Sequence, residues 1–484
     1  MNNRKIFTIK RNRSWIILVL AVSMLYSCVP SREIREENKS LPESYQENVI
    51  QDTLNTAVME WKQFFADPNL VSLIDTALVN NQELNIMLQR VSVARNEIGA
   101  RKGEYLPSLN IQAAAEVEKV GRYTSQGAND ATTDIRPGEE FPEPLPNYLV
   151  SAFASWELDV WKKLRNSKKA AVMEYLSSVE GKNFMVTNLI SEVAESFYEL
   201  QALDNELAII EQNLELQTNA LKTIRIQKQA ARATELGVQR FEAEVLKNRS
   251  EKFAVRQEIV ETENRINFLI GRMPQPIHRE SADFVERKLD TMYTGVPSQL
   301  LENRADIRQA EFELSAARLD TKAAKANFYP SFTIRAGVGL ESFNTKFLTS
   351  TPESLLYSLA GDMVAPLINR NAIKAEYNSA NDRQLQAVFE YEKTILNAYM
   401  EVQNQLSNLE NLRQSYVLKE EQVAALTRSI ELTNKLFRSA RADYLEVLLT
   451  QREALESKME LVDTRKNQLM ARVAMYRNLG GGWQ

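Results

Sequence analysis

The sequence predicts an α+β membrane protein in which long antiparallel coiled-coil helices accompany four β-strands per chain. Three observations predict this class: a seven-residue hydrophobic repeat, two pairs of segments that alternate apolar and polar residues, and a duplication of the whole pattern within 484 residues. Gly and Pro are scarce, at 15 and 14 residues, which is typical of long helices. We therefore expect two internal repeats rather than a single enzyme core.

The seven-residue repeat occurs once in each half of the chain. Apolar residues recur at every seventh position from Val193 to Leu221 and again, largely so, from Ile395 to Phe437. The two series stand 202 positions apart, and the offset later becomes 209, a gain of one heptad. A strict heptad predicts helices that pack along a seam. Return helices are expected through two further series: Leu246, Phe253 and Val260; and Leu448, Leu455, Val462, Leu469 and Tyr476.

The first 27 residues resemble a secretory signal peptide. They hold five basic and no acidic residues, and the apolar run from Trp15 to Leu25 is too short to span a bilayer. The run ends at Leu25-Tyr26-Ser27-Cys28, which resembles a bacterial lipoprotein box. We interpret Cys28, the only cysteine, as a lipid-bearing (palmitate-modified) first mature residue; the alternative is an incidental cysteine of the signal peptide. A single cysteine predicts a mature chain without an internal disulfide.

Helix and strand signals follow one another in the same order in both halves. A helix is expected from Asp67-Pro68 to about Lys102, and its counterpart from Pro297 to about Ala326. Each is followed by a proline, Pro107 or Pro330, and then by an alternating segment. The expected boundaries are a signal peptide at 1–27, an extended tether at 28–66, repeat 1 at 67–271, a linker at 272–296 and repeat 2 at 297–484.

The alternating segments predict strands with one apolar and one polar face. They lie at about 109–118, 148–158, 332–341 and, less clearly, 355–365, with loops at 121–146 and 344–352. Their length is that of a tilted strand crossing a bilayer, about 9–11 residues. Four strands cannot close a barrel, since the smallest have about eight, so several copies would share one barrel. The polar positions that would line its water-filled bore are Asn110, Gln112, Glu116, Thr333 and Arg335.

Several motifs resemble the TolC-like outer-membrane factors, specifically the lipoprotein branch that serves resistance-nodulation-division pumps. The match covers nearly the whole mature chain. It includes Ser155-Trp-Glu-Leu-Asp-Val-Trp-Lys-Lys-Leu-Arg165, Val296-Pro-Ser-Gln-Leu-Leu-Glu-Asn-Arg-Ala-Asp-Ile-Arg308 with Ala326-Asn-Phe-Tyr-Pro-Ser331, Ala365-Pro-Leu-Ile-Asn-Arg-Asn371 and Tyr476-Arg-Asn-Leu-Gly-Gly-Gly-Trp483. The resemblance implies a homotrimer with a twelve-stranded barrel in the outer membrane and a periplasmic α-barrel, docking a periplasmic adaptor (membrane fusion) protein and an inner-membrane pump.

The resemblance also implies roles for the ends of the helical hairpins. The segment 441–452 resembles the family's periplasmic gate, in which Leu445 and Leu449 would form apolar constrictions and Arg452 a charged layer. Asp443 and Glu446 are candidates for salt bridges between protomers. Ala231 and Ala440 mark the adaptor-docking tips, where family members usually carry glycine, and Leu449 stands where the family often has aspartate. The alternative is that both leucines are ordinary coiled-coil core residues.

Catalysis and cofactor binding receive no support from the residues. His278 is the only histidine, lies in the linker and is expected at the surface. One His and one lipidated Cys cannot assemble a His/Cys metal site, and the Gly-rich phosphate loop of nucleotide-binding proteins is missing. A net charge of -5 argues against nucleic acid as a partner. We expect no enzyme activity and no cofactor.

The leading hypothesis is a passive outer-membrane exit duct for small molecules. A related alternative is a duct that exports polypeptides. An alternative from another class is a non-conducting, lipid-anchored periplasmic coiled-coil scaffold, in which the alternating strands form a soluble sheet.

Overall fold

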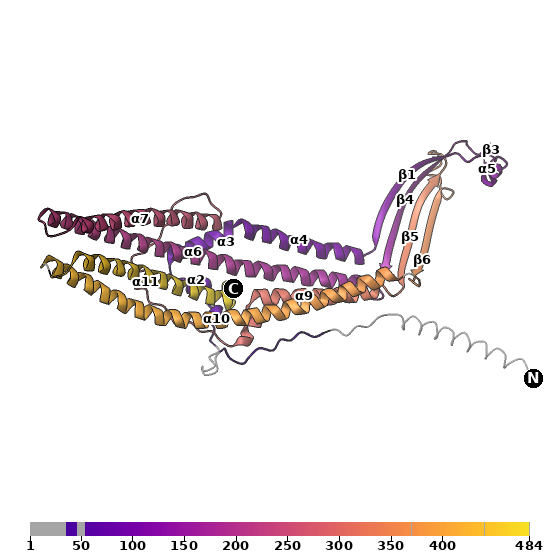
Figure 1. Cartoon of the computed structure of the whole chain (residues 1–484). Coiled ribbons are helices and arrows are strands. Elements are labelled where there is room, and N and C mark those ends of the chain that lie inside the picture. Colours follow the sequence, from indigo (N-terminus) through magenta and orange to yellow (C-terminus); the bar gives the residue numbers. More distant parts are fainter. Residues whose placement is uncertain (1–34, 46–53, 369, 440, 484) are drawn as a thin grey trace, which may run out of the picture. The chain divides into compact units, whose positions relative to one another are not determined.

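The computed structural model of the chain describes residues 35–45, 54–368, 370–439 and 441–483 (Figure 1). The predicted signal peptide, Cys28 and Ala440 lie outside these residues. The chain divides into two compact units. The first comprises 1–36, 93–176 and 312–389, and the second comprises 37–92, 177–311 and 390–484.

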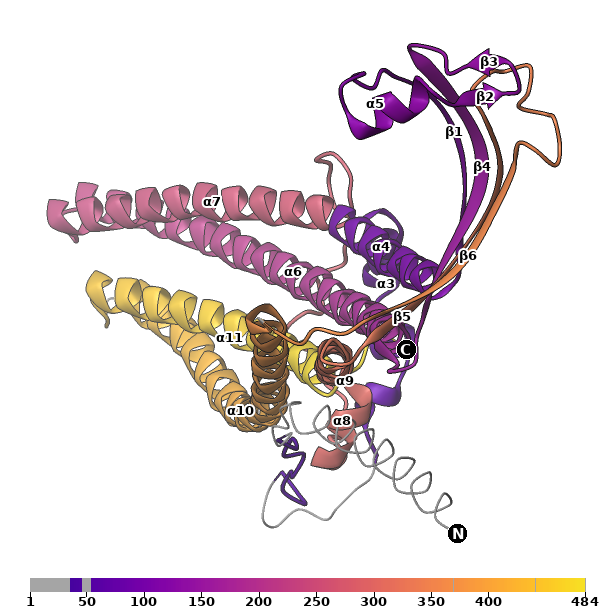
Figure 2. The same cartoon turned by 90° about the vertical axis from the view of Figure 1, so that its right-hand side faces the viewer.

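The first unit contains a four-stranded antiparallel sheet. Its strands are β1 (Ser108–Glu118), β4 (Leu145–Leu158), β5 (Ser331–Ser342) and β6 (Leu355–Val364), in the order β1-β4-β5-β6. All four predicted strands are confirmed, including β6, whose alternating pattern is the least clear of the four. The predicted loop at 121–146 contains further structure: α5 (Ser125–Asp130) and a short hairpin of β2 (Asp134–Arg136) and β3 (Glu139–Glu140). The four long strands bend together to one side (Figure 2).

Two long helical hairpins follow the two strand pairs. In the first, α6 (Lys163–Gln229) has 67 residues and α7 (Glu235–Leu269) has 35. In the second, α10 (Asn371–Arg438) has 68 residues and α11 (Tyr444–Asn478) has 35. In both views α7 runs beside α6 and α11 beside α10 (Figures 1 and 2). The helices predicted from the heptad series at 193–221 and 395–437 are therefore confirmed.

The helices that precede the strands are broken where the sequence predicted continuity. Instead of one helix, α3 (Pro68–Asn80) and α4 (Gln82–Tyr105) are separated by Asn81. The Asn81 side chain accepts a hydrogen bond from the Leu84 amide (2.8 Å) and donates one to the Leu269 carbonyl (2.8 Å). Asn81 thus begins the second helix in the way an N-cap residue does, with its side chain satisfying a free backbone donor.

The counterpart in the second half breaks at Arg304. Here η2 (Pro297–Gln299) and α8 (Leu300–Asn303) precede α9 (Ala305–Ala326). The buried Arg304 guanidinium pairs with Asp306 (2.7 Å) and Glu401 (2.8 Å) and donates to the Asn478 carbonyl (2.9 Å). Arg304 itself has an extended backbone, with ψ 119°, and separates α8 from α9.

Residues 37–45 of the predicted tether have no regular secondary structure and bind the helices of the second unit. Lys39 forms an ion pair with Glu311 (2.7 Å), and the Tyr45 ring stacks on Tyr399 at 5.8 Å. Past residue 53 the segment forms η1 (Thr56–Val58), whose first amide donates to the Tyr293 carbonyl (2.8 Å), and then α2 (Trp61–Phe64). The segment is therefore held to the protein rather than free.

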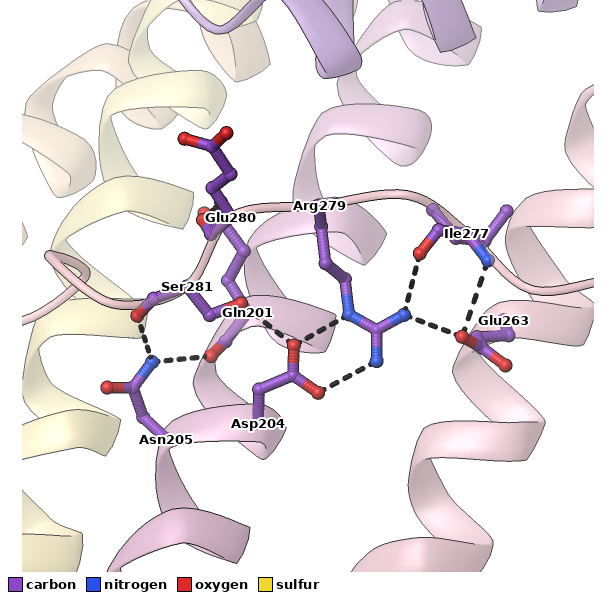
Figure 3. Close-up of polar contacts among 8 residues, drawn as sticks. All are labelled: Gln201, Asp204, Asn205, Glu263, Ile277, Arg279, Glu280 and Ser281. Carbon is purple, nitrogen blue, oxygen red and sulfur yellow. Dashed lines mark hydrogen bonds and ion pairs between the residues drawn. The ribbon is translucent and has the colours of Figure 1, made fainter.

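The linker between the halves is held against α6 and α7 by Arg279 (Figure 3). The guanidinium binds Asp204 with two hydrogen bonds of 2.7 Å and Glu263 with one of 2.5 Å. Burial alone would lower the pKa of Arg279, but the bonds to the two carboxylates outweigh it and leave the pKa raised. Linker residues on both sides of Arg279, Ile277 and Phe284, belong to a core shared by α3, α6, α7 and α11, which includes Ile74, Phe197 and Val473.

Candidate functional site

The register of the sheet sorts its residues into two chemically different faces. Directly paired residues of antiparallel strands point to the same side. One row across all four strands reads Leu109, Ala154, Ala336 and Leu359. The rows on the same side continue this apolar face with Ile111, Ala113, Ala115, Val117, Tyr148, Val150, Ala152, Trp156, Leu158, Phe332, Ile334, Val338, Leu340, Leu355, Tyr357 and Met363.

The apolar face is largely uncovered within the chain. Ile111, Tyr357 and Leu359 are each 81% exposed. A contiguous apolar surface of this extent is unusual on a soluble monomer and marks contact with lipid or with another protein. The same face carries no charged residue on any of the four long strands.

The opposite face is polar. It bears the five predicted bore residues, Asn110, Gln112, Glu116, Thr333 and Arg335, together with Ser151, Ser155, Glu157, Glu341 and Asp362. Arg335 and Asp362 form an ion pair across β5 and β6 at 3.4 Å. The Asn147 amide donates to the Glu341 carboxylate at 2.7 Å. This polar face is suited to contact with water.

The sheet has two unpaired edges within the described chain. β1 and β6 are its outermost strands, and each bonds to one neighbour only. An unpaired backbone group in a bilayer costs several kcal/mol, so a sheet with such edges needs partner strands in lipid.

Aromatic residues and an aspartate fix the corner where the sheet meets the helices. The indole nitrogen of Trp156 donates to the Tyr105 carbonyl (3.2 Å), and that of Trp161 donates to the Pro330 carbonyl (2.7 Å). Asp159 precedes α6, which begins at Lys163, and accepts bonds from the Leu164 and Arg165 amides of its first turn. These residues explain the motif at 155–165: it joins β4 to α6 and ties the corner to the Tyr105 and Pro330 carbonyls.

At the other end of the helices, the tips of the two hairpins share an apolar cluster. The tip cluster consists of Leu221, Ile224, Val238, Phe241, Val245 and Val447, with Tyr444 and Leu448 packed against it. Thr234 caps α7 and Asp443 caps α11, each through its side-chain oxygen. Ala231 lies in the turn between α6 and α7 with φ 57, a left-handed conformation that favours glycine.

Of the predicted gate residues, Asp443 is the N-cap of α11 and the others lie on its first turns. Tyr444, Val447 and Leu448 face the cluster. Leu445 is half-buried, Leu449 is 37% exposed, and Arg452 and Glu446 are exposed. Arg452 lies 3.9 Å from Glu456 of its own helix. Within the protomer, Leu445 and Leu449 are therefore not members of the tip cluster.

One of the two return helices has an uncovered heptad seam. Leu246, Phe253 and Val260 of α7 are between 48% and 69% exposed. The corresponding residues of α11, Leu455, Val462 and Leu469, are at most 6% exposed. This row of apolar residues is therefore covered in the second hairpin and open in the first within the chain.

Other kinds of site are not supported by the described residues. Within them no group of His, Cys, Asp and Glu side chains could hold a metal ion. His278 is exposed, as expected. No helix among them combines the length and the apolarity needed to cross a bilayer.

Comparison with known proteins gives consistent matches over most of the chain. The family model described as "Outer membrane efflux protein" matches residues 73–272 and 296–481. The pyoverdine export outer membrane protein OpmQ of Pseudomonas aeruginosa is 27% identical over 427 residues, 88% of each chain. The cation efflux system protein CusC of Escherichia coli is 27% identical over 426 residues, 87% of this chain and 88% of that one. The fold is similar to that of the MtrE outer membrane channel of Neisseria gonorrhoeae, with a TM-score of 0.82 and 22% identity over 94% of this chain and 99% of that chain.

Proposed function

The chain belongs to the outer membrane efflux protein family, and we propose that it is the outer-membrane exit duct of a tripartite efflux system. In this function it is a passive conduit for small molecules, driven by an inner-membrane pump through a periplasmic adaptor. The observation that carries the proposal is the sheet, with one face apolar, one face polar and two edges unpaired. Such a sheet suits the wall of a water-filled barrel.

A homotrimer would satisfy the unpaired edges. β1 of one copy would pair with β6 of the next, and three copies would give a twelve-stranded barrel. The open seam of α7 supports the same assembly below the membrane, because a neighbouring copy's helix would cover Leu246, Phe253 and Val260. The two internal repeats, 67–271 and 297–484, would make the helical tube nearly six-fold.

We further propose that Cys28 carries a lipid and that the protein is of the lipoprotein branch serving resistance-nodulation-division pumps. The docked residues near Lys39 would hold the anchored segment to the helices. Metabolic labelling with an alkyne fatty acid tests this: Cys28→Ser should lose the label while the wild type keeps it. If the Cys28→Ser variant keeps the label, the lipid is attached to another residue and the assignment to Cys28 is wrong.

The tip residues would form the gate and the docking site. Leu445 and Leu449 are not among the residues of the tip cluster, and three copies could bring them together as apolar rings. Glu446 and Asp443 could then pair across protomers, with Arg452 as the adjacent charged layer, and the turns at Ala231 and Ala440 would contact the adaptor. The relatives' names support small cargo, since they refer to pyoverdine and to cations.

Planar-bilayer recording tests the proposal against the non-conducting scaffold. The duct predicts discrete channel currents from detergent-purified protein, and the scaffold predicts none. A matched pair of variants locates the lipid-facing side. Leu359→Asp should abolish insertion because a charge would face lipid, whereas Ser358→Asp, one residue away on the polar face, should still insert and conduct.

A further inference from the structure

The two ends of the four-stranded sheet carry charge of opposite sign. The segments that join the sheet to the helices, 101–107, 157–169, 322–330 and 365–374, hold eleven basic and three acidic residues. The loops at the other end of the strands, 119–144 and 343–354, hold four basic and six acidic residues. The excess of positive charge therefore lies at the end of the sheet that meets α4, α6, α9 and α10.

The basic residues at the start of α6 divide between the two sides of the sheet. Lys163 pairs with Glu157 of the polar face at 3.3 Å. The Arg165 guanidinium carbon instead lies 6.0 Å from the centre of the Tyr105 ring. The Tyr105 carbonyl accepts the hydrogen bond of Trp156, a residue of the apolar face. Arg165 is therefore on the side of the apolar face.

Three lysines accompany Arg165. Lys168 and Lys169 follow it by three and four positions and so share its side of the helix, and Lys162 directly precedes the helix. Arg165 pairs with Asp159 at 3.0 Å, but the three lysines form no ion pair within the described residues. Lys162 also has φ 61, a conformation that favours glycine, so this position carries a lysine at some cost to the backbone.

Apolar and aromatic side chains lie at the same corner. Trp161 stacks on Tyr329, with ring centres 4.6 Å apart, and is 37% exposed. Leu106 and Val160, in the connections beside it, are exposed as well. Where lysines border an exposed apolar surface, their aliphatic stems cover that surface while the ammonium groups reach the headgroup layer of a membrane.

We propose that Lys162, Arg165, Lys168 and Lys169, the basic collar, bind the phosphate headgroups of anionic phospholipids in the leaflet nearest the helices. The collar continues the apolar face beyond its last row, where the headgroups of a surrounding bilayer begin, and its unpaired ammonium groups are complementary to phosphate. The collar rests on the proposed function, because it requires the sheet to lie in a bilayer. It would fix the depth of the sheet and enrich anionic lipid around the protein.

Quenching of tryptophan fluorescence by brominated lipids reports which lipid lies beside the collar, because Trp156 and Trp161 are at this corner. The full-length protein is reconstituted into vesicles of phosphatidylcholine and phosphatidylglycerol, with bromine on the acyl chains of one lipid or the other. The collar predicts that phosphatidylglycerol is preferred by at least about fivefold at low salt, the effect of one lysine near an anionic surface. High salt should remove the preference by screening. Equal quenching by the two lipids at low salt, or a preference that salt does not reduce, would overturn the proposal.

Two triple variants with the same loss of charge locate the effect. The collar variant combines Lys162→Gln, Lys168→Gln and Lys169→Gln. The control variant combines exposed positions of the helical hairpins in the second unit, Lys222→Gln, Lys247→Gln and Lys435→Gln. The collar variant should bind the two lipids about equally, and the control should keep the wild-type preference. Loss of the preference in both variants, or in neither, would contradict the collar.

The outcomes separate the collar from the proposed function. Channels that conduct but are surrounded equally by both lipids would remove the collar and leave the duct intact. Protein whose tryptophan fluorescence is quenched by neither brominated lipid does not lie in the bilayer, and this result would remove both.

Discussion

The ring of Tyr444 rests on the backbone of Gly237, and this contact joins the first turn of α11 to the first turn of α7. A Cβ at Gly237 would lie 3.3 Å from two ring atoms of Tyr444 and 3.0 Å from the Ile224 Cδ1. The absence of a side chain at Gly237 therefore allows the two hairpins to approach closely within the tip cluster.

Gly237→Val is expected to separate the tips. The branched side chain cannot fit between Ile224 and Tyr444, and overpacking of this kind costs about 1–3 kcal/mol. Single-channel conductance or open probability should rise, and the melting temperature should fall. Gly99→Val is the control, since a Cβ there has no neighbour within 4 Å. Unchanged channel behaviour in Gly237→Val would show that this contact does not hold the tips together.

The double variant Leu445→Ser with Leu449→Ser is expected to increase conductance with little loss of stability. Both side chains lie off the tip cluster, so their removal should act on the passage rather than on the protomer's core. Leu432→Ser, on an exposed position of α10, is the control and should behave as the wild type. Conductance of the double variant equal to that of the wild type would refute the assignment of these leucines to the gate.

Arg279→Ala is expected to destabilise the protein by about 3–5 kcal/mol, because it leaves two partly buried carboxylates without their cation. Asp204 and Glu263 would then face each other across the vacated site. Chemical denaturation measures the loss. Arg413→Ala removes an ion pair with Glu410 on an exposed face and should have no measurable effect. Comparable stability of the two variants would mean that the linker network contributes little.

Glu206→Gln is expected to raise the melting temperature at neutral pH. Burial raises the pKa of Glu206 above its ordinary value of 4.5, so the folded state binds a proton at this carboxyl more tightly than the unfolded state does. The stability that this group contributes is fully present below the unfolded pKa and is lost as pH rises through the folded pKa. The difference between variant and wild type should therefore vanish at pH values below about 4.5.

The control for this pH dependence is Glu410, whose shift has the opposite sign. Hydrogen bonds from Arg413 and Gln414 lower the pKa of Glu410 to about 2. Because Glu410 is exposed and its pair with Arg413 contributes little to stability, Glu410→Gln should leave the melting temperature at neutral pH unchanged. A Glu206→Gln variant that melts below the wild type at neutral pH would contradict the role assigned to burial.

The strands and their faces could be predicted from the sequence because residues alternate between the two faces along each strand. Antiparallel pairing then places apolar residues opposite apolar residues on one face of the sheet. Asn110 and Thr333 lie on one side of the sheet for this reason. The hydrogen bonds of Trp156 and Trp161 at the corner could not be predicted, since they depend on carbonyl groups from distant segments.

The helix breaks at Asn81 and Arg304 were missed because a single polar residue does not interrupt a helical pattern. At each break the polar side chain binds a group far away in the sequence, the Leu269 carbonyl for Asn81 and the Glu401 carboxylate for Arg304. The sequence does place the two breaks at equivalent positions of the two halves, since Asn81 and Arg304 stand 223 positions apart, as Pro107 and Pro330 do. The structural role of Gly237 could not be predicted either, since it requires Tyr444 from the other hairpin.

The most direct test of the account is a cross-link between the two edges of the sheet. In a chain with Ala113→Cys in β1 and Leu359→Cys in β6, the two thiols are separated by β4 and β5, whereas neighbouring copies in a shared barrel would bring them together. A short bis-maleimide added to membranes should give covalent dimers and trimers and no larger species, with each single variant remaining monomeric. Only monomers from the double variant, or cross-linked products from a single variant, would contradict the shared barrel.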